Sequence, residues 1–106
     1  MDQLILEILN SSLNNKEKAE LLNLRQTQVV CKTLLLSDWR SKSEEYISLF
    51  VKNHNLLEIW SNTYYPKHKR LEAVGLKLHT RTPIEVVYYI GTYVDYDIRS
   101  ALKEAA

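Results

Sequence analysis

Residues 39–60, WRSKSEEYISLFVKNHNLLEIW, hold a long run of apolar side chains at helical spacing. The intervals between them are three, four and seven residues, as on the buried face of an α-helix. The stretch therefore predicts the core helix of the fold, either continuing to about residue 64 or broken into two helices at Asn53. The residues that we expect in the core are Trp39, Tyr46, Phe50, Leu57 and Trp60.

Apolar residues recur at the same spacing on both sides of this stretch, and we expect further helices over about residues 2–12, 16–36 and 66–74. Asn14 is expected to cap the second of them, and Ser37 or Ser41 the helix that follows.

The clearest start signal is Thr82-Pro83-Ile84-Glu85, with threonine at the N-cap, proline at the first helical position and glutamate at the third. A helix is expected to begin at Pro83. It either ends at Gly91 or continues through it, and Asp95 is a candidate cap for a final segment.

The chain has 106 residues, with only two glycines and two prolines, which excludes a β-rich fold with frequent tight turns. A chain of this length forms one domain. We expect a single all-α domain over residues 1–106, built as a compact bundle of five to six helices.

With 14 basic and 13 acidic residues the net charge is +1, so the sequence lacks the strong electrostatic footprint of a dedicated non-specific nucleic-acid binder. The positive charge is concentrated in residues 65–82, where five basic residues accompany one acidic residue. A single cysteine, no signal-peptide pattern and no long apolar run favour a cytoplasmic protein without a membrane segment.

No pattern of catalytic or metal-binding residues is present in the sequence, and we expect a protein without enzymatic activity, cofactor or metal. Cys31 could combine with His54, His68 and His79, but the spacings of 23, 14 and 11 residues between successive members of this set match no common ligand spacing. A semi-buried cysteine on a helix and three surface histidines are the simpler interpretation.

Residues 16–36 fit part of a helix-turn-helix pattern, with Ala19 in the first helix, Asn23 at the turn, and Leu24 and Val29 packed inside. Asparagine tolerates the left-handed conformation that such a turn requires. The residues that would read base edges are Arg25, Gln26, Thr27 and Gln28. The residues that would contact phosphates are Lys32, Lys67, Lys69 and Arg70.

The alternative for residues 16–36 is one uninterrupted helix, because the segment contains no helix breaker. Lys18 and Lys32 also occupy positions where a helix-turn-helix needs apolar packing. A continuous helix across residues 23–25 would remove the main support for DNA reading.

Tyrosines cluster near the C-terminus, and Tyr89, Tyr93 and Tyr96 share one helical face if the helix passes through Gly91. Tyrosine is enriched at protein interfaces, so these three residues are a candidate interface with another protein or with a second copy in a homodimer.

Two functions follow from these patterns, both of a small non-enzymatic binding protein. The first is a DNA-binding regulator of transcription of the helix-turn-helix type. The second is a protein-binding adaptor or inhibitor that uses the tyrosine-rich C-terminal helix and makes no contact with nucleic acid.

Overall fold

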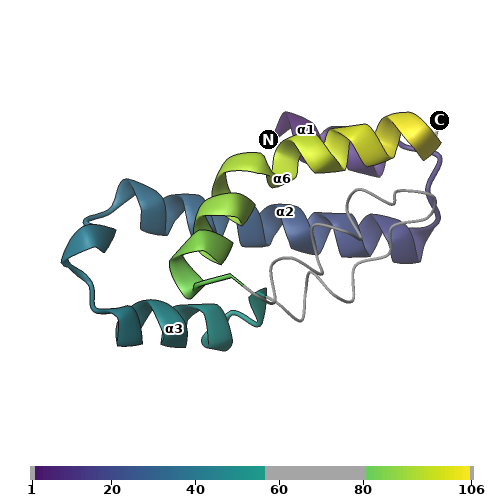
Figure 1. The fold of residues 1–106 in the computed structure, drawn as a ribbon. Coiled ribbons are helices and arrows are strands. Elements are labelled where there is room, and N and C mark those ends of the chain that lie inside the picture. Colours follow the sequence, from purple (N-terminus) through teal and green to yellow (C-terminus); the bar gives the residue numbers. More distant parts are fainter. Residues whose placement is uncertain (1, 57–80, 106) are drawn as a thin grey trace.

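The computed structural model describes residues 2–56 and 81–105, which form an all-helical bundle with no strand in these ranges (Figure 1). The elements are α1 (Gln3–Leu9), α2 (Asn15–Leu36), the short 3-10 helix η1 (Trp39–Ser41), α3 (Glu44–Asn53) and α6 (Pro83–Ala105). The predicted all-α class is confirmed. The helix predicted at 66–74 and the core residues Leu57 and Trp60 lie outside the described residues.

Side-chain caps begin each of the first three α-helices. Asp2 accepts the Leu4 N–H at 2.8 Å, and Asn14 accepts the Glu17 N–H at 2.8 Å, as predicted for Asn14. Ser43 caps α3, so this helix begins after the predicted caps at Ser37 and Ser41. The Ser41 hydroxyl donates instead to the Asp38 carbonyl at 2.7 Å within η1. Local hydrogen bonding thus sets where these helices begin.

The start of α6 at Pro83 confirms the sequence prediction. The Thr82 hydroxyl donates to Glu85 at 2.7 Å, and Arg81 donates to the same carboxylate at 3.2 Å. The helix then continues through Gly91 to Ala105, so Asp95 does not cap a separate segment. Among the described residues, Asn55 alone has a positive φ, and Gly91 keeps helical geometry.

The centre of the bundle is the contact between α2 and α6, which run in opposite directions (Figure 1). Both helices contribute apolar residues at helical spacing to one cluster. Its members on α2 are Leu21, Leu24, Cys31 and Leu34, and those on α6 are Val86, Val87, Ile90, Val94 and Ile98. These two long helices therefore form the core of the described bundle.

The prediction that residues 39–60 form the core helix is wrong for the part that the structure describes. Tyr46 is 46% exposed, and Trp39 and Phe50 are only partly buried. The buried residues of α3 are Ile47 and Val51, each one position after a predicted core aromatic. The aromatic rings lie at the edge of the bundle, where Arg40 and Lys42 stack on Trp39 and Tyr46 at 5.2 and 5.1 Å from the ring centres.

The helix-turn-helix predicted within residues 16–36 is absent, because α2 is helical without interruption from Asn15 to Leu36. Its buried face repeats across the expected turn, with Leu21, Leu24, Gln28 and Cys31 at intervals of three and four. Packing against α6 thus agrees with the intrinsic preference of the segment for a helix.

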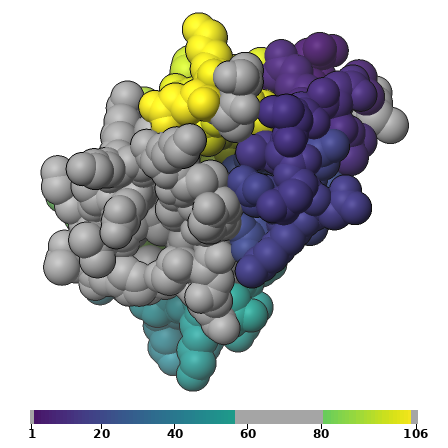
Figure 2. Space-filling view, turned by 90° about the vertical axis from the view of Figure 1, so that its right-hand side faces the viewer, coloured from purple at the N-terminus to yellow at the C-terminus, as the bar shows by residue number. Residues whose placement is uncertain are grey.

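The N-terminal helix α1 packs on both α2 and α6. The space-filling view shows α1 and the start of α2 directly beside the C-terminal end of α6 (Figure 2). No helix in the described ranges is long and apolar enough to span a membrane.

Candidate functional site

The four predicted base-reading residues do not share a surface. Thr27 and Gln28 are buried, Arg25 is half-buried and Gln26 is exposed. The Thr27 hydroxyl donates to the Asn23 carbonyl at 2.9 Å, one turn earlier in α2. Of the predicted phosphate contacts, Lys32 is exposed on α2, whereas Lys67, Lys69 and Arg70 lie outside the described residues.

Gln28 is 0% exposed and forms the centre of a polar network that connects three helices. Its amide nitrogen donates to Asp95 at 2.8 Å and to the Gly91 carbonyl at 3.3 Å, both on α6. Its amide oxygen accepts a hydrogen bond from Arg25. Both ends of the buried amide therefore have partners, as a polar group in the interior requires.

The network continues from Arg25 to α1. The guanidinium donates through Nε to Asp2 at 2.9 Å, and its Nη2 lies 2.8 Å from the same carboxylate oxygen. Desolvation alone would raise the pKa of Asp2, but Arg25 and the amides of Leu4 and Ile5 outweigh it and hold this pKa below its ordinary value. Asp2 is therefore charged at neutral pH. Arg25 and Gln28, which the sequence suggested as base readers, hold the bundle together.

Gly91 lies beside this network at a tight contact between α6 and α2. A Cβ atom at this position would lie 2.8 Å from Leu35 Cδ1, 3.3 Å from Cys31 Cβ and 3.3 Å from the Lys32 backbone nitrogen. The absence of a side chain lets the helices approach, and Gln28 then reaches the Gly91 carbonyl.

Cys31 is buried at the same helix contact, and burial raises the pKa of its thiol to about 12. The nucleophilic form of cysteine is the thiolate, so this thiol is unreactive at neutral pH. His54 is bound locally, with Nδ1 3.0 Å from the Phe50 carbonyl, and His68 and His79 lie outside the described residues. No group of three potential metal ligands is found in the described ranges.

The burial of Cys31 predicts slow modification by a thiol reagent such as dithionitrobenzoate. In native buffer at pH 7.5 we expect reaction at least ~100-fold slower than in concentrated urea, because the reagent must wait for opening of the α2–α6 contact. Absorbance of the released thiolate measures both rates. A native rate within tenfold of that of glutathione in the same buffer would contradict the buried position.

The tyrosines of α6 form the most distinctive surface in the described chain. Tyr88, Tyr93 and Tyr96, which we call the tyrosine surface, are 52%, 43% and 66% exposed. The Tyr93 ring centre lies 6.3 Å from that of Tyr88 and 5.5 Å from that of Tyr89. Tyr89 is half-buried, and its hydroxyl donates to the buried Asp97 at 2.5 Å.

The predicted set Tyr89, Tyr93 and Tyr96 thus differs from the exposed set at one position. Tyr89 is half-buried and packs against the Tyr93 ring, whereas Tyr88 is exposed and was not in the set predicted from the sequence. A helical projection centred on Val87, Ile90 and Val94 would have placed Tyr88 on the solvent side, because residues at this spacing define the buried face. The projection requires a helix that continues through Gly91, and the sequence left open whether the helix ends there.

The charged groups around the tyrosine surface are paired within the protein. Glu85 binds Thr82 and Arg81, and the Thr82 hydrogen bond, which is the largest influence, lowers the pKa of this carboxyl. Arg99, one turn after Tyr96, donates to Glu7 of α1 at 2.6 Å. The aromatic surface is therefore flanked by the ion pairs of Glu85 and Arg99, while the carboxylates of Asp95 and Asp97 accept hydrogen bonds from Gln28 and Tyr89.

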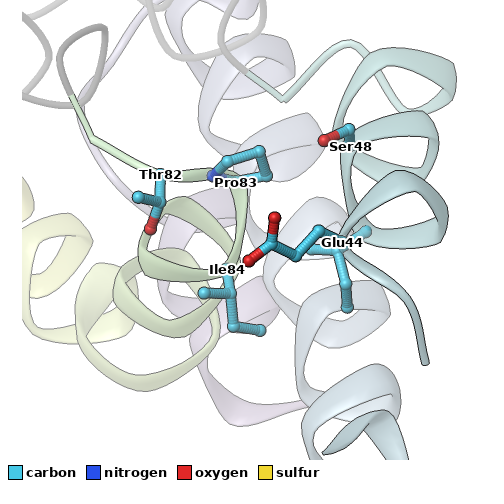
Figure 3. Close-up of a pocket in the computed structure, with 6 residues that line it drawn as sticks. Glu44, Ser48, Thr82, Pro83 and Ile84 are labelled. Carbon is cyan, nitrogen blue, oxygen red and sulfur yellow. The ribbon is translucent and has the colours of Figure 1, made fainter. Parts of the chain in front are cut away.

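A small hollow of about 210 Å³ lies between α3 and the start of α6 (Figure 3). The Glu44 carboxylate and the Ser48 hydroxyl extend from α3 toward the first turn of α6, where Pro83 and Ile84 complete the lining. This volume is below the range of about 300–1,000 Å³ typical of sites for drug-sized ligands. The tyrosine surface is therefore the stronger candidate site.

Comparison with known proteins found no matching family model, no matching curated protein and no matching solved structure. The class of protein is that of an all-α helical bundle. The geometry of its surfaces is the basis for inferring function.

Proposed function

We propose that this protein is a non-enzymatic protein-binding module of the adaptor or inhibitor type, which docks a partner on the tyrosine surface without contacting nucleic acid. The observation that carries the proposal is the exposure of three large aromatic rings on one helix of a well-packed bundle. Aromatic residues are enriched in the centres of protein interfaces and contribute many of their energetic hot spots.

Two of the three rings of the tyrosine surface, Tyr88 and Tyr93, are packed within the protein before a partner binds. The opposite side of α6 is fixed in the core by Val87, Ile90 and Val94. Tyr93 packs against the rings of Tyr88 and Tyr89, and Tyr89 is hydrogen bonded to Asp97. A preorganised surface loses little side-chain entropy on binding, so more of the contact energy is retained as affinity.

The chemistry of the surface favours an uncharged partner face. The ion pairs Arg81–Glu85 and Glu7–Arg99 flank it, and the neighbouring carboxylates of Asp95 and Asp97 accept hydrogen bonds within the protein. The α6 segment contains four acidic and two basic residues, which disfavours a phosphate backbone. The occupant that fits best is the apolar side of an amphipathic helix from another protein, because tyrosine rings supply apolar area and their hydroxyls can form a polar rim.

The proposal predicts a loss of partner affinity when the tyrosine surface is truncated. With a purified partner, Tyr93→Ala combined with Tyr96→Ala should raise Kd by about 30- to 900-fold, because each ring removed at an interface centre costs about 1–2 kcal/mol. Isothermal titration calorimetry measures the change. Circular dichroism should show an unchanged helical signal, since both rings are largely exposed.

The matched control is Tyr46→Ala on α3, because Tyr46 is 46% exposed and belongs to a different helix. Its Kd should stay within about twofold of the wild-type value, as for a residue outside the interface. Equal affinities of the double variant and the wild type would contradict the proposal. Retention of the wild type on duplex DNA at low salt would contradict the absence of nucleic-acid contact.

A further inference from the structure

The short helix α1 fills a groove between α2 and α6. Asp2 pairs with Arg25 at one end, and the Leu9 carbonyl accepts a 2.9 Å hydrogen bond from Lys18 at the other. Positions 2 to 9 therefore run against positions 25 to 18, antiparallel to the first half of α2. On the other side, Glu7 meets Arg99 of α6.

The floor of this groove is apolar and receives two anchors. Leu4 and Ile8, one turn apart on α1, are 1% and 0% exposed and belong to the common core cluster. Leu21 lies between Lys18 and Arg25 on the same side of α2 and is also buried. Two anchors spaced i and i+4 in an apolar groove are the usual way in which a globular protein holds an amphipathic helix.

The rim of the groove is basic. Lys18, Arg25 and Arg99 each donate a hydrogen bond to α1, and the acceptors are a backbone carbonyl and two carboxylates. Within Gln3–Leu9 the charged residue is Glu7, and Asp2 caps the helix. Two of the three basic side chains thus meet carboxylates of the α1 segment, and Lys18 meets a backbone carbonyl.

The packing of α1 against the bundle is weaker than the packing between α2 and α6. Seven residues are fewer than the roughly 12–15 that an isolated helix needs, so α1 depends on its groove. The Glu7–Arg99 pair is 38% and 47% exposed, which limits its contribution to stability. We therefore expect α1 to open separately from the core.

We propose that the α2–α6 groove is a docking site for an acidic amphipathic helix of another protein, and that α1 occupies the site until such a helix displaces it. The recognised pattern is that of α1 itself, Asp2-x-Leu4-x-x-Glu7-Ile8, with two acidic contacts around two apolar anchors. This site is distinct from the tyrosine surface, and its test does not use those residues.

The test uses a fluorescent peptide with the sequence of residues 2–13, DQLILEILNSSL, and the chain of residues 1–106. In the wild type, α1 competes at an effective concentration in the millimolar range. The variant Ile8→Asp removes this competition, because a carboxylate cannot enter the apolar groove. Fluorescence anisotropy should show at least ~50-fold tighter peptide binding by Ile8→Asp than by the wild type.

Charge exchange then tests the specificity of the groove. In the Ile8→Asp background, Arg99→Glu should weaken binding of the peptide several-fold, and a peptide carrying Glu7→Arg should recover it. Lys103→Glu, an equal charge change at an exposed position of the same helix, should leave binding unchanged. A peptide with aspartate in place of Leu4 and Ile8 should not bind.

The proposal would be overturned if a folded Ile8→Asp variant does not bind the peptide. It would also be overturned if this variant binds the wild-type peptide and the Glu7→Arg peptide with equal affinity. If this variant loses its helical signal, hydrogen exchange of the wild type decides. If the α1 amides exchange hydrogen at least ~100-fold faster than the α2 amides, the result supports a helix that can leave its groove. Equal hydrogen-exchange rates in α1 and α2 would overturn the proposal. A wild-type dimer that exchanges α1 between copies would assign the groove to a second copy and overturn the assignment to another protein.

Discussion

Gly91→Leu is expected to lower the free energy of unfolding by about 3 kcal/mol or more, because overpacking a tight core contact forces the backbones apart. Even the first side-chain atom would lie 3.3 Å from the Lys32 backbone nitrogen and 2.8 Å from Leu35 Cδ1. The Leu35 methyl can rotate away, but the α2 backbone cannot. For a domain whose total stability is about 5–15 kcal/mol, this loss is large.

Urea unfolding followed by circular dichroism measures this effect as a lower midpoint at unchanged slope. Gly91→Ala should cost only about 1 kcal/mol, since the better helix propensity of alanine partly offsets the displacement of Leu35 and the tight 3.3 Å contact of the new Cβ with the Lys32 backbone nitrogen. Lys103→Leu is the control for leucine on the exposed side of α6. Wild-type stability of Gly91→Leu would show that the two helices do not require this close approach.

Gln28→Leu is expected to cost about 2 kcal/mol, because it leaves partners in a partly buried network without their hydrogen bonds. Asp95 would lose a 2.8 Å bond and Arg25 would lose an acceptor, while leucine fills nearly the same space. The loss should also loosen α1, since Arg25 connects Gln28 to Asp2. Urea unfolding measures the global effect, and hydrogen exchange of the α1 amides measures the local one.

The control for this prediction is Gln26→Leu, the same substitution two residues earlier on the exposed face of α2. A surface substitution of this kind usually changes stability by less than ~0.5 kcal/mol. Equal stability of the two variants would contradict a structural role for the Gln28 network. An increase in stability for Gln28→Leu would contradict it as well.

The starts of α2 and α6 were the parts of the fold that the sequence predicted best. Asn14 caps α2, and Thr82 with Pro83 and Glu85 begins α6, as expected. These signals are local, since a capping side chain bonds to a backbone amide or side chain within a few residues of itself. The all-α class follows from the same regularity and from the scarcity of glycine and proline.

The choice of the central helix could not be predicted in the same way. The aromatic pattern from Trp39 to Phe50 is regular, yet α3 lies at the edge of the bundle and buries Ile47 and Val51 instead. A regular apolar pattern shows that a helix has an apolar side. How deeply that side is buried depends on which helices pack against it.

The residues of the candidate site also divide into those that local sequence could predict and those that depend on how the helices pack. Tyr93 and Tyr96 were selected from the sequence and are exposed, whereas Tyr88 needed a continuous α6 to be placed. Arg25 and Gln28 have the chemistry of base readers, but their donors are used inside the protein. Polar residue type alone does not distinguish a surface reader from a buried hydrogen-bonding residue.

The sequence by itself determined that this chain is helical, where α2 and α6 begin, and that tyrosines gather near its end. The tertiary structure decided the role of Gln28, because its partners Gly91 and Asp95 are 63 and 67 residues away in the chain. Caps act within one turn of a helix, whereas burial and long-range hydrogen bonds exist only after distant helices have packed.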